Sequence, residues 1–161
     1  MKPSVGEALR PAPTVRAFRR GDQTAARALI EGGLGEHFGF VDRHANPDLI
    51  DIAATYAAPN AFFVAELDGA IVGAAGVLIE HGAARMVRLG VTRERRRSGV
   101  ASALLDKVVE FAARAGSEEL AVHTQPEWPD AMRFYAAHGF VAYGRDDVDV
   151  YLRRRINGAV P

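Results

Sequence analysis

A run of arginines stands directly before the longest amphipathic segment of the chain, and this arrangement could bind an anion. Four arginines fall within residues 93–97, and the small residues Ser98, Gly99 and Ala101 follow closely. If a helix starts at Ser98, the backbone N–H groups of its first turn have no partner, and the helix dipole gathers positive potential around them. Small side chains would let a phosphate approach, and guanidinium groups would add full charges. The segment predicts a diphosphate site; from these residues alone, a solvated basic turn is the alternative.

Two spacings in the chain resemble the GNAT superfamily of N-acetyltransferases. The first is similar to the acetyl-CoA motif of that family and runs Leu89-x-Val91, then Arg96-x-x-Gly99-x-Ala101. The second is similar to the family's second conserved motif and runs Trp128-x-x-Ala131-x-x-Phe134-Tyr135-x-x-x-Gly139-Phe140. Both motifs, in this order, are more specific than either alone. The resemblance covers residues 15–153 and implies a GNAT-like fold.

The resemblance also implies where acetyl-CoA would lie. In the family, the strand before the first motif splays from the next strand, so free backbone groups at Leu89 and Val91 would pair with the pantetheine arm. Backbone N–H groups from Arg97 to Ser102 would hold the diphosphate, and coenzyme A would be the product. The implied cofactor-binding residues are Leu89, Val91, Arg96, Arg97, Ser98, Gly99, Val100, Ala101 and Ser102.

Tyr135 occupies the place of the tyrosine that, in the family, donates a proton to the departing thiolate. A phenol with a pKa of about 10 suits this role, because it stays protonated at neutral pH and can supply a proton as charge develops on sulfur. On the helix pattern alone, a half-buried core tyrosine beside Phe134 is the better interpretation. The match to the motif reverses that order, so Tyr135 is the predicted catalytic residue.

The chain departs from the family pattern at two places. Trp128 stands where the second motif usually begins with asparagine, and an indole cannot reproduce the hydrogen bonds of an amide. In many relatives a glutamate on the strand before the first motif helps to deprotonate the amine, whereas this strand carries Arg85, Met86 and Arg88. The general base is therefore unassigned, and ordered water could carry the proton away. His123 is interpreted as a structural histidine.

Acidic residues and histidines cluster after the first predicted helix, in a region that borders the acceptor pocket in the family. These residues, Glu36, His37, Asp42 and His44, are candidates for the general base, and their spacing fits no tight ligand set, so no metal site is predicted. Arg85 and Arg88 could bind a carboxylate, which would favour an amino acid or a similar acidic metabolite over a polyamine. The predicted acceptor-binding residues are Glu36, His37, Asp42, Arg85 and Arg88.

The elements that would position these residues follow from hydrophobic periodicity and turn signals. Strands are predicted at 14–18, 61–67, 70–80, 84–92, 120–124, 140–143 and 148–152. Helices are predicted at 22–31, from Asn46 to just before Pro59, at 98–115 and at 129–138, with a loop over 32–44. This order predicts an α/β fold with a mixed, mostly antiparallel sheet of about seven strands flanked by four helices. We expect a leader at 1–13, one acyltransferase domain at 14–155 and a tail at 156–161.

Composition limits the class of protein. The 161 residues are 48% hydrophobic and 25% charged, as in soluble globular domains, and they include no cysteine. A thiol nucleophile, an iron–sulfur cluster and disulfides are excluded, so any acyl transfer would be direct. No uncharged run approaches the ~20 residues needed to span a bilayer, and a net charge of zero gives no reason to expect nucleic acid. We expect a soluble cytoplasmic domain with neither a membrane nor a nucleic-acid partner.

The paired motifs and the basic helix start predict an acetyl-CoA-dependent N-acyltransferase. It would move an acetyl group directly to a primary amine of a small molecule or peptide. The competing prediction is a non-catalytic acyl-CoA-binding or sensor domain of the same fold, which Trp128 and the missing strand glutamate favour. A homodimer would follow only by analogy with the family.

Overall fold

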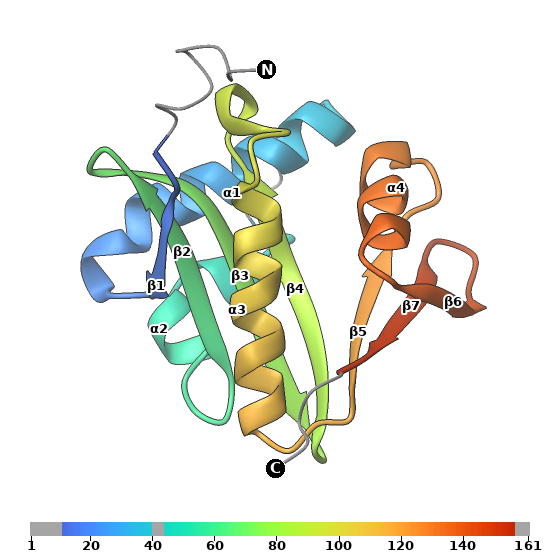
Figure 1. Ribbon diagram of the computed structural model, residues 1–161. Helices are drawn as coiled ribbons and strands as arrows, with labels where there is room; N and C mark the ends of the chain where they lie inside the picture. Colours follow the sequence, from blue (N-terminus) through green and yellow to red (C-terminus); the bar gives the residue numbers. More distant parts are fainter. Residues whose placement is uncertain (1–10, 40–43, 157–161) are drawn as a thin grey trace, which may run out of the picture.

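A computed structural model describes residues 11–39 and 44–156, and its framework is one mixed β-sheet (Figure 1). The seven strands lie in the order β1-β2-β3-β4-β5-β7-β6. Neighbouring strands are antiparallel except β4 and β5, which are parallel. The strands are β1 (Thr14–Ala17), β2 (Ala61–Leu67), β3 (Ala70–Glu80), β4 (Ala83–Val91), β5 (Glu119–Thr124), β6 (Val141–Arg145) and β7 (Val150–Arg155).

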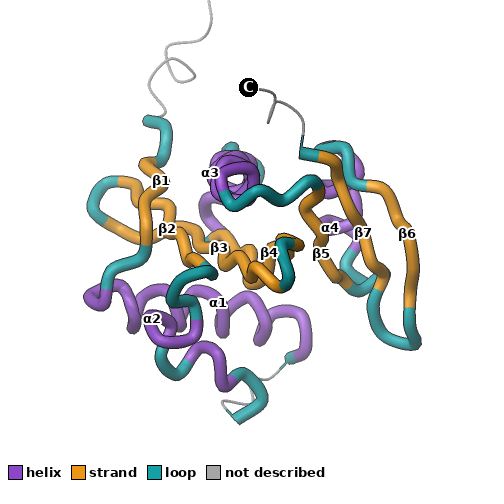
Figure 2. The backbone as a smooth tube through the Cα atoms, turned by 90° about the horizontal axis from the view of Figure 1, so that it is seen from below, coloured by secondary structure: helices purple, strands orange, loops and turns teal. Residues whose placement is uncertain are grey.

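Four α-helices flank this sheet, as predicted, and they lie on both of its faces (Figure 2). They are α1 (Gln23–Phe38), α2 (Ile52–Thr55), α3 (Val100–Arg114) and α4 (Pro129–Ala137). The main core lies between the sheet and α3 and includes residues of α4. A smaller core lies between the sheet and the α1–α2 layer. The predicted α/β class, with a mixed and mostly antiparallel sheet, is confirmed.

The α3 helix forms because its apolar residues recur on one face and pack directly on the sheet. Its buried side chains are Val100, Leu104, Leu105, Val108 and Ala112. The approach to β3 is close enough that a Cβ at Gly73 would lie 2.7 Å from Val100 Cγ1. The helix ends at Arg114, and Gly116, with a φ of 84°, follows the C-cap Ala115. Packing of α3 on the main core therefore fixes where its first turn points.

The parallel contact between β4 and β5 is short. Its register runs only from Ala84 opposite Leu120 to Met86 opposite Val122. Immediately afterwards β4 has one extra residue relative to β3, because Val87 faces Gly76 and Gly90 faces Ala74. Such a bulge bends a strand and increases its twist. The bulge therefore lies where β4 leaves β5, and the edge of β4 beyond Met86 is not paired with β5.

The first helix is longer than predicted. The glycines at 32, 33 and 35 favoured a loop after residue 31, but α1 continues to Phe38 and ends at Gly39, with a φ of 79°. The extension is explained by Leu34, which packs on the second core. Tertiary packing of this face overrides the low helix propensity of glycine. The predicted loop over 32–44 is thus wrong for 32–38.

The predicted helix after Asn46 is broken into two pieces. A short 3-10 helix covers Pro47–Leu49, and α2 starts after Asp51, whose side chain accepts from the Ala54 N–H at 3.1 Å. Asn46 makes no capping bond, and Ile50 is 59% exposed. The reason is that Asn46 and Asp48 contact an arginine of β4 instead.

The remaining boundaries are close to the prediction, although β6 and β7 both begin and end later than expected. Most of the predicted leader and tail lies outside the described residues. Ile156, which we assigned to the tail, is buried, and its N–H donates to the Glu118 carbonyl at 2.9 Å.

Candidate active site

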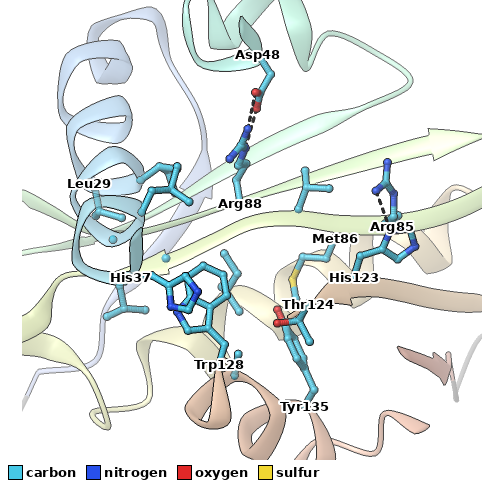
Figure 3. A pocket seen from close by; sticks show the side chains of 18 of the residues that line it. Leu29, His37, Asp48, Arg85, Met86, Arg88, His123, Thr124, Trp128 and Tyr135 are labelled. Carbon is cyan, nitrogen blue, oxygen red and sulfur yellow. Dashed lines mark hydrogen bonds and ion pairs between the residues drawn. The ribbon is translucent and has the colours of Figure 1, made fainter. Parts of the chain in front are cut away.

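A cavity of about 860 Å³ lies where β4 and β5 part (Figure 3). Its walls come from α1, the 46–56 segment, β4, β5 and α4. Eight residues predicted from the sequence line it, namely Glu36, His37, Arg85, Arg88, Leu89, Val91, Arg96 and Tyr135. The other predicted cofactor residues, Arg97, Ser98, Gly99, Val100, Ala101 and Ser102, follow Arg96 at the start of α3 and are not part of the wall. The predicted residue Asp42 lies outside the described residues.

The first turn of α3 leaves backbone donors available. Gly99 is the N-cap with a φ of 90°, and no side chain caps the helix. Ala103 N–H donates to the Gly99 carbonyl at 3.0 Å, so the N–H groups of 99–102 precede the intrahelical bonds. Arg97 also has a positive φ, 60°, and the Ser98 hydroxyl donates to the Arg95 carbonyl rather than to the helix. Turn conformations of this kind direct N–H groups outward and favour anions.

Arg96 links this helix start to the last turn of α1. Its guanidinium lies 2.8 Å from Glu36 Oε2, and its Nε donates to the Val91 carbonyl at 3.3 Å. Hydrogen bonding to Arg96 holds the pKa of Glu36 below its usual value. Both side chains remain partly exposed at the rim of the cavity. Pairing with Arg96 and the lowered pKa make the Glu36 carboxylate a weaker proton acceptor than a free carboxylate.

Tyr135 is held in place by aromatic packing on α4. It is 8% exposed and lies edge-on between Phe134 and Phe140, with ring centroids 5.4 and 5.3 Å away. None of the hydrogen bonds among the described residues involves its hydroxyl, and the side chain lines the cavity. Burial raises the pKa of Tyr135, so the phenol is fully protonated at neutral pH. The Tyr135 hydroxyl can therefore donate its proton to a ligand, because no described side chain accepts a hydrogen bond from it.

A hydrogen-bonded histidine joins α4 to α3. His138 Nδ1 lies 2.7 Å from the Phe134 carbonyl, which can only accept, so this nitrogen carries the proton. The other ring nitrogen, Nε2, then accepts from the Ser102 hydroxyl at 2.9 Å. The Ser102–His138 hydrogen bond therefore connects the first turn of α3 to α4, the helix that carries Tyr135.

Aromatic side chains close one end of the cavity. The His37 ring lies 4.2 Å from the Trp128 ring, and Phe38 packs on the same indole at 6.2 Å. These contacts join the end of α1 to the start of α4 (Figure 3). Trp128 makes no capping hydrogen bond to α4, as expected for an indole in place of an amide. Its contacts here are stacking ones.

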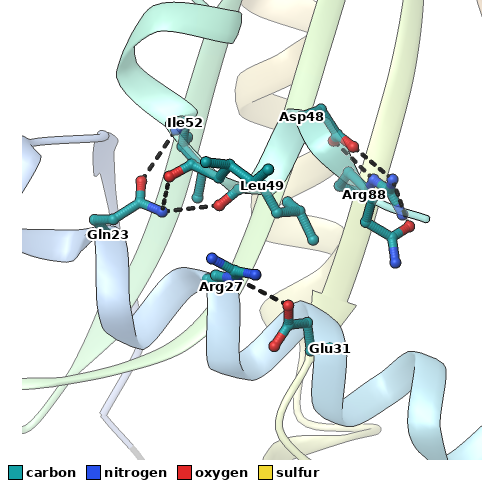
Figure 4. Close-up of polar contacts among 9 residues, drawn as sticks. Gln23, Arg27, Glu31, Asp48, Leu49, Ile52 and Arg88 are labelled. Carbon is teal, nitrogen blue, oxygen red and sulfur yellow. Dashed lines mark hydrogen bonds and ion pairs between the residues drawn. The ribbon is translucent and has the colours of Figure 1, made fainter. Parts of the chain in front are cut away.

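Arg88, predicted to bind an acceptor carboxylate, is occupied by a carboxylate of the chain itself (Figure 4). Its Nη2 and Nε donate to the two oxygens of Asp48 at 2.7 and 2.9 Å, and Nη2 also donates to Asn46 Oδ1 at 2.9 Å. The Tyr56 hydroxyl donates to Asp48 at 2.9 Å. Burial pushes the pKa of Asp48 upward, but hydrogen bonding and the charge of Arg88 outweigh it, so the pKa lies below its usual value.

The Asp48–Arg88 pair also supports the bulge. Arg88 has a φ of 56°, a conformation that costs a non-glycine residue about 1 kcal/mol or more. Gln23 fixes the segment that carries Asp48, because its amide donates to the Leu49 carbonyl at 2.8 Å and accepts from the Ile52 N–H at 3.0 Å (Figure 4). Sequence reasoning missed Asp48 as a site residue, since an acid in the first turn of a helix is explained by the helix dipole.

The opposite end of the cavity carries Arg85 and His123. Arg85 Nη1 lies 3.3 Å from His123 Nδ1, and the His123 ring lies 4.4 Å from Tyr151. The Tyr151 hydroxyl donates to Asp146. Burial and the charge of Arg85 lower the pKa of His123. His123 thus has the partners expected of a structural histidine, yet it also lines the site.

The sequence model of the acetyltransferase (GNAT) family matches residues 27–140. Among curated proteins, N-acetyltransferase 8B of Homo sapiens is 30% identical over 122 residues, which is 71% of this chain and 54% of that protein. The probable N-acetyltransferase camello of Xenopus tropicalis is 29% identical over 126 residues, 73% of this chain and 58% of that protein. The chain therefore spans about half the length of the curated relatives it matches.

Solved structures share the fold. A GNAT-family acetyltransferase from Staphylococcus aureus Mu50 has a TM-score of 0.82 and 21% identity, covering 91% of this chain and 100% of that one. The PaiA N-acetyltransferase from Thermoplasma acidophilum, solved in complex with coenzyme A, has a TM-score of 0.77 and 14% identity, covering 90% and 99%. Within the described residues, no helix has both the length and the hydropathy needed to cross a membrane. Because the family match extends over residues 27–140, well beyond half of the sequence, the chain belongs to the GNAT acetyltransferase family.

Proposed function

We propose that the chain transfers the acetyl group of acetyl-CoA directly to a primary amine of a small molecule or peptide. The observation that carries this proposal is the uncapped start of α3 next to a cavity that Tyr135 lines. An anion-binding helix start and a buried proton donor are the two groups that a thioester cosubstrate with a diphosphate requires.

The residues at the start of α3 fit a diphosphate. A Cβ built on Gly99 would meet no heavy atom within 4 Å, so the backbone is open to a phosphate. The N–H groups of 99–102 would bind phosphate oxygens, and Arg96 would add charge at the rim of the cavity. The main chain at Leu89 and Val91 would pair with the pantetheine arm along the edge of β4 that β5 leaves unpaired.

The thioester supplies an activated acyl group, and the chain's own residues would manage charge and protons around it. As the C–N bond forms and the C–S bond breaks, negative charge passes through the carbonyl oxygen to sulfur. A backbone N–H of β4 near Val91 would stabilise the oxygen. The Tyr135 hydroxyl would protonate the sulfur, and water would take the proton lost by the amine.

Two glycines of α3 offer a matched test of the diphosphate site. Gly99 and Gly116 stand at opposite ends of the helix with φ values of 90° and 84°, and an added Cβ is unobstructed at both. Replacing either by alanine should cost about 1 kcal/mol of unfolding free energy, because an L residue is strained there. Only Gly99→Ala should weaken acetyl-CoA binding, by roughly tenfold or more, since the alanine methyl lies where the phosphate approaches. Titration calorimetry would show this difference; equal affinities in the two variants would place the diphosphate elsewhere.

The competing function is acyl-CoA binding without transfer. It is favoured by Trp128, which replaces the usual asparagine, and by arginines on β4 where many relatives carry a glutamate. Release of free thiol from acetyl-CoA, measured over a panel of amines, separates the two functions. A sensor would bind acetyl-CoA and release no thiol with any amine above the rate without protein.

A further inference from the structure

Three arginines line the cavity, and two of them form an ion pair with a carboxylate of the chain. Arg88 is paired with Asp48, and Arg96 is paired with Glu36. The third arginine of the wall, Arg85, has no carboxylate within ion-pair distance in the described part of the chain. An arginine inside a partly enclosed site keeps its charge, so this guanidinium is left for a partner from outside.

Arg85 is oriented by a neutral group that leaves most of its donors free. A guanidinium only donates, so His123 Nδ1 accepts from Arg85 Nη1 at 3.3 Å and the imidazole proton sits on Nε2. Tyr151 packs on the other side of the imidazole, 4.4 Å between ring centroids, and its hydroxyl is bonded to Asp146. This series of contacts across β4, β5 and β7 fixes the guanidinium without neutralising it.

The position of Arg85 separates it from the diphosphate site. It lies on β4 opposite Ala121 of β5, in the last paired stretch before the bulge. In Figure 3, Arg85 and His123 are at one end of the cavity, and His37 and Trp128, which adjoin Glu36 and Arg96, are at the other. Tyr135 and Thr124 lie between the two ends. A group bound by Arg85 would therefore reach the reacting centre from the side away from the phosphates.

A second charge at the same wall has no ion-pair partner among residues 11–39 and 44–156. Asp149 lines the cavity and directly precedes Val150 of β7, which lies opposite Thr124 of β5, next to His123. The cavity thus presents one unmatched cation and one unmatched anion. A ligand that carries both an ammonium and a carboxylate group complements this pair better than a polyamine or a neutral amine does.

We propose that the acceptor is an amine that also carries a carboxylate, and that Arg85, not Arg88, binds that carboxylate. This inference rests on the proposed acetyl transfer and names its acceptor class. A planar carboxylate accepts two hydrogen bonds from one guanidinium, which gives both affinity and orientation. The amine would then be directed toward Tyr135.

The test compares acceptors that differ only in the acid group, namely phenylalanine, phenylalaninamide and phenethylamine. For the unmodified chain, we expect kcat/KM from free-thiol release to be about tenfold or more higher for the acid than for its amide. Arg85→Gln should remove that preference mainly by raising KM for the acid, and leave the amide almost unchanged. Arg114→Gln, which removes an exposed arginine at the far end of α3, controls for net charge and should keep the preference.

Binding without turnover distinguishes failure of this proposal from failure of the proposed function. Trp128 is the only tryptophan and lines the cavity, so its fluorescence reports binding of each amine in the presence of coenzyme A. Thiol release with equal kcat/KM for acid and amide, or a preference that survives Arg85→Gln, would overturn the role of Arg85 and leave the transferase intact. Tighter binding of the acid that depends on Arg85, without thiol release, would support the carboxylate site and overturn the transfer. If no amine binds or reacts, both proposals fail.

Discussion

At the scale of single residues, the site depends on side chains whose protonation is set by their surroundings. Tyr135 keeps its proton because it is 8% exposed and burial raises its pKa. Tyr135→Phe keeps the ring and removes only the proton donor. We expect kcat to fall by about 100-fold, the usual scale of general acid catalysis, while acetyl-CoA affinity changes little.

Tyr143→Phe is the matched control, because Tyr143 is 46% exposed on β6 and is not part of the cavity wall. It should leave kcat unchanged. Steady-state kinetics by thiol release and calorimetry of acetyl-CoA would provide both numbers. A Tyr135→Phe protein with the parental kcat would mean that another group protonates the sulfur.

Asp48 gives a prediction about pH. Its pKa in the folded chain is below the usual value, because the contacts with Arg88 outweigh its burial. A depressed carboxylate pKa contributes stability that is present above the unfolded pKa of about 3.9 and is lost as the pH falls toward the folded value. Asp48→Asn should therefore lower the unfolding free energy at pH 7 by about 2 kcal/mol and reduce its decline below pH 4.

Urea unfolding at pH 7, 4 and 3 would measure this difference. Asp106→Asn on the exposed side of α3 is the comparison and should follow the unmodified chain at each pH. A constant difference between Asp48→Asn and the unmodified chain across these pH values would show that the ion pair adds no pH-dependent stability.

At the scale of elements, local signals predicted those parts of the fold that local physics determines. Asp68-Gly69 and His81-Gly82 both adopt positive φ, as two-residue hairpin turns require, and β2 and β3 have the predicted bounds. The α3 helix followed from its apolar periodicity, and its basic start from the arginine run. Tyr135 and the cofactor residues were predicted from their resemblance to family motifs, because such motifs keep a fixed spacing in the sequence.

The misplaced elements are those that depend on distant partners. Gly32 and Gly33 argue against helix locally, but the α1 face that carries Leu34 is stabilised by packing on the sheet. Asn46 looks like a helix cap and Asp48 like a first-turn acid, yet both bind Arg88, forty residues away from Asp48 along the chain. The ion pairs of Arg88 and Arg96 join residues far apart in the sequence, so the lack of such a pair at Arg85 could be seen only in the folded structure.

The link between α3 and α4 gives a prediction at this scale. Ser102 and His138 form a hydrogen bond of 2.9 Å, and His138 also stacks on Phe134 at 4.2 Å. In a double-mutant cycle of Ser102→Ala and His138→Ala, the coupling energy should be about 1 kcal/mol, the net value of a partly buried hydrogen bond. Urea unfolding of the four proteins would measure it, and strictly additive effects would show that the contact does not connect the helices.

At the scale of the whole molecule, the sheet has a weak seam but a continuous core. The parallel pairing of β4 with β5 covers only residues 84–86 and 120–122. The main core nevertheless crosses this seam, because Leu105 and Val108 of α3 belong to the same buried cluster as Leu120, Tyr135 and Phe140. Burial of one shared apolar cluster favours a single cooperative transition over separate unfolding of two halves.

Two signals test this cooperativity. Trp128 fluorescence follows the start of α4 and its contact with the end of α1, and circular dichroism at 222 nm is dominated by α1 and α3, the two longest helices. Both should report the same melting temperature. Acetyl-CoA at about 100 times its dissociation constant should add about 2.7 kcal/mol and raise both melting temperatures together by roughly 5–10 °C. Two separate transitions would mean that the halves fold independently. A ligand-induced shift in one signal alone would mean that acetyl-CoA binds to one half, instead of bridging β4 and α4 across the cavity.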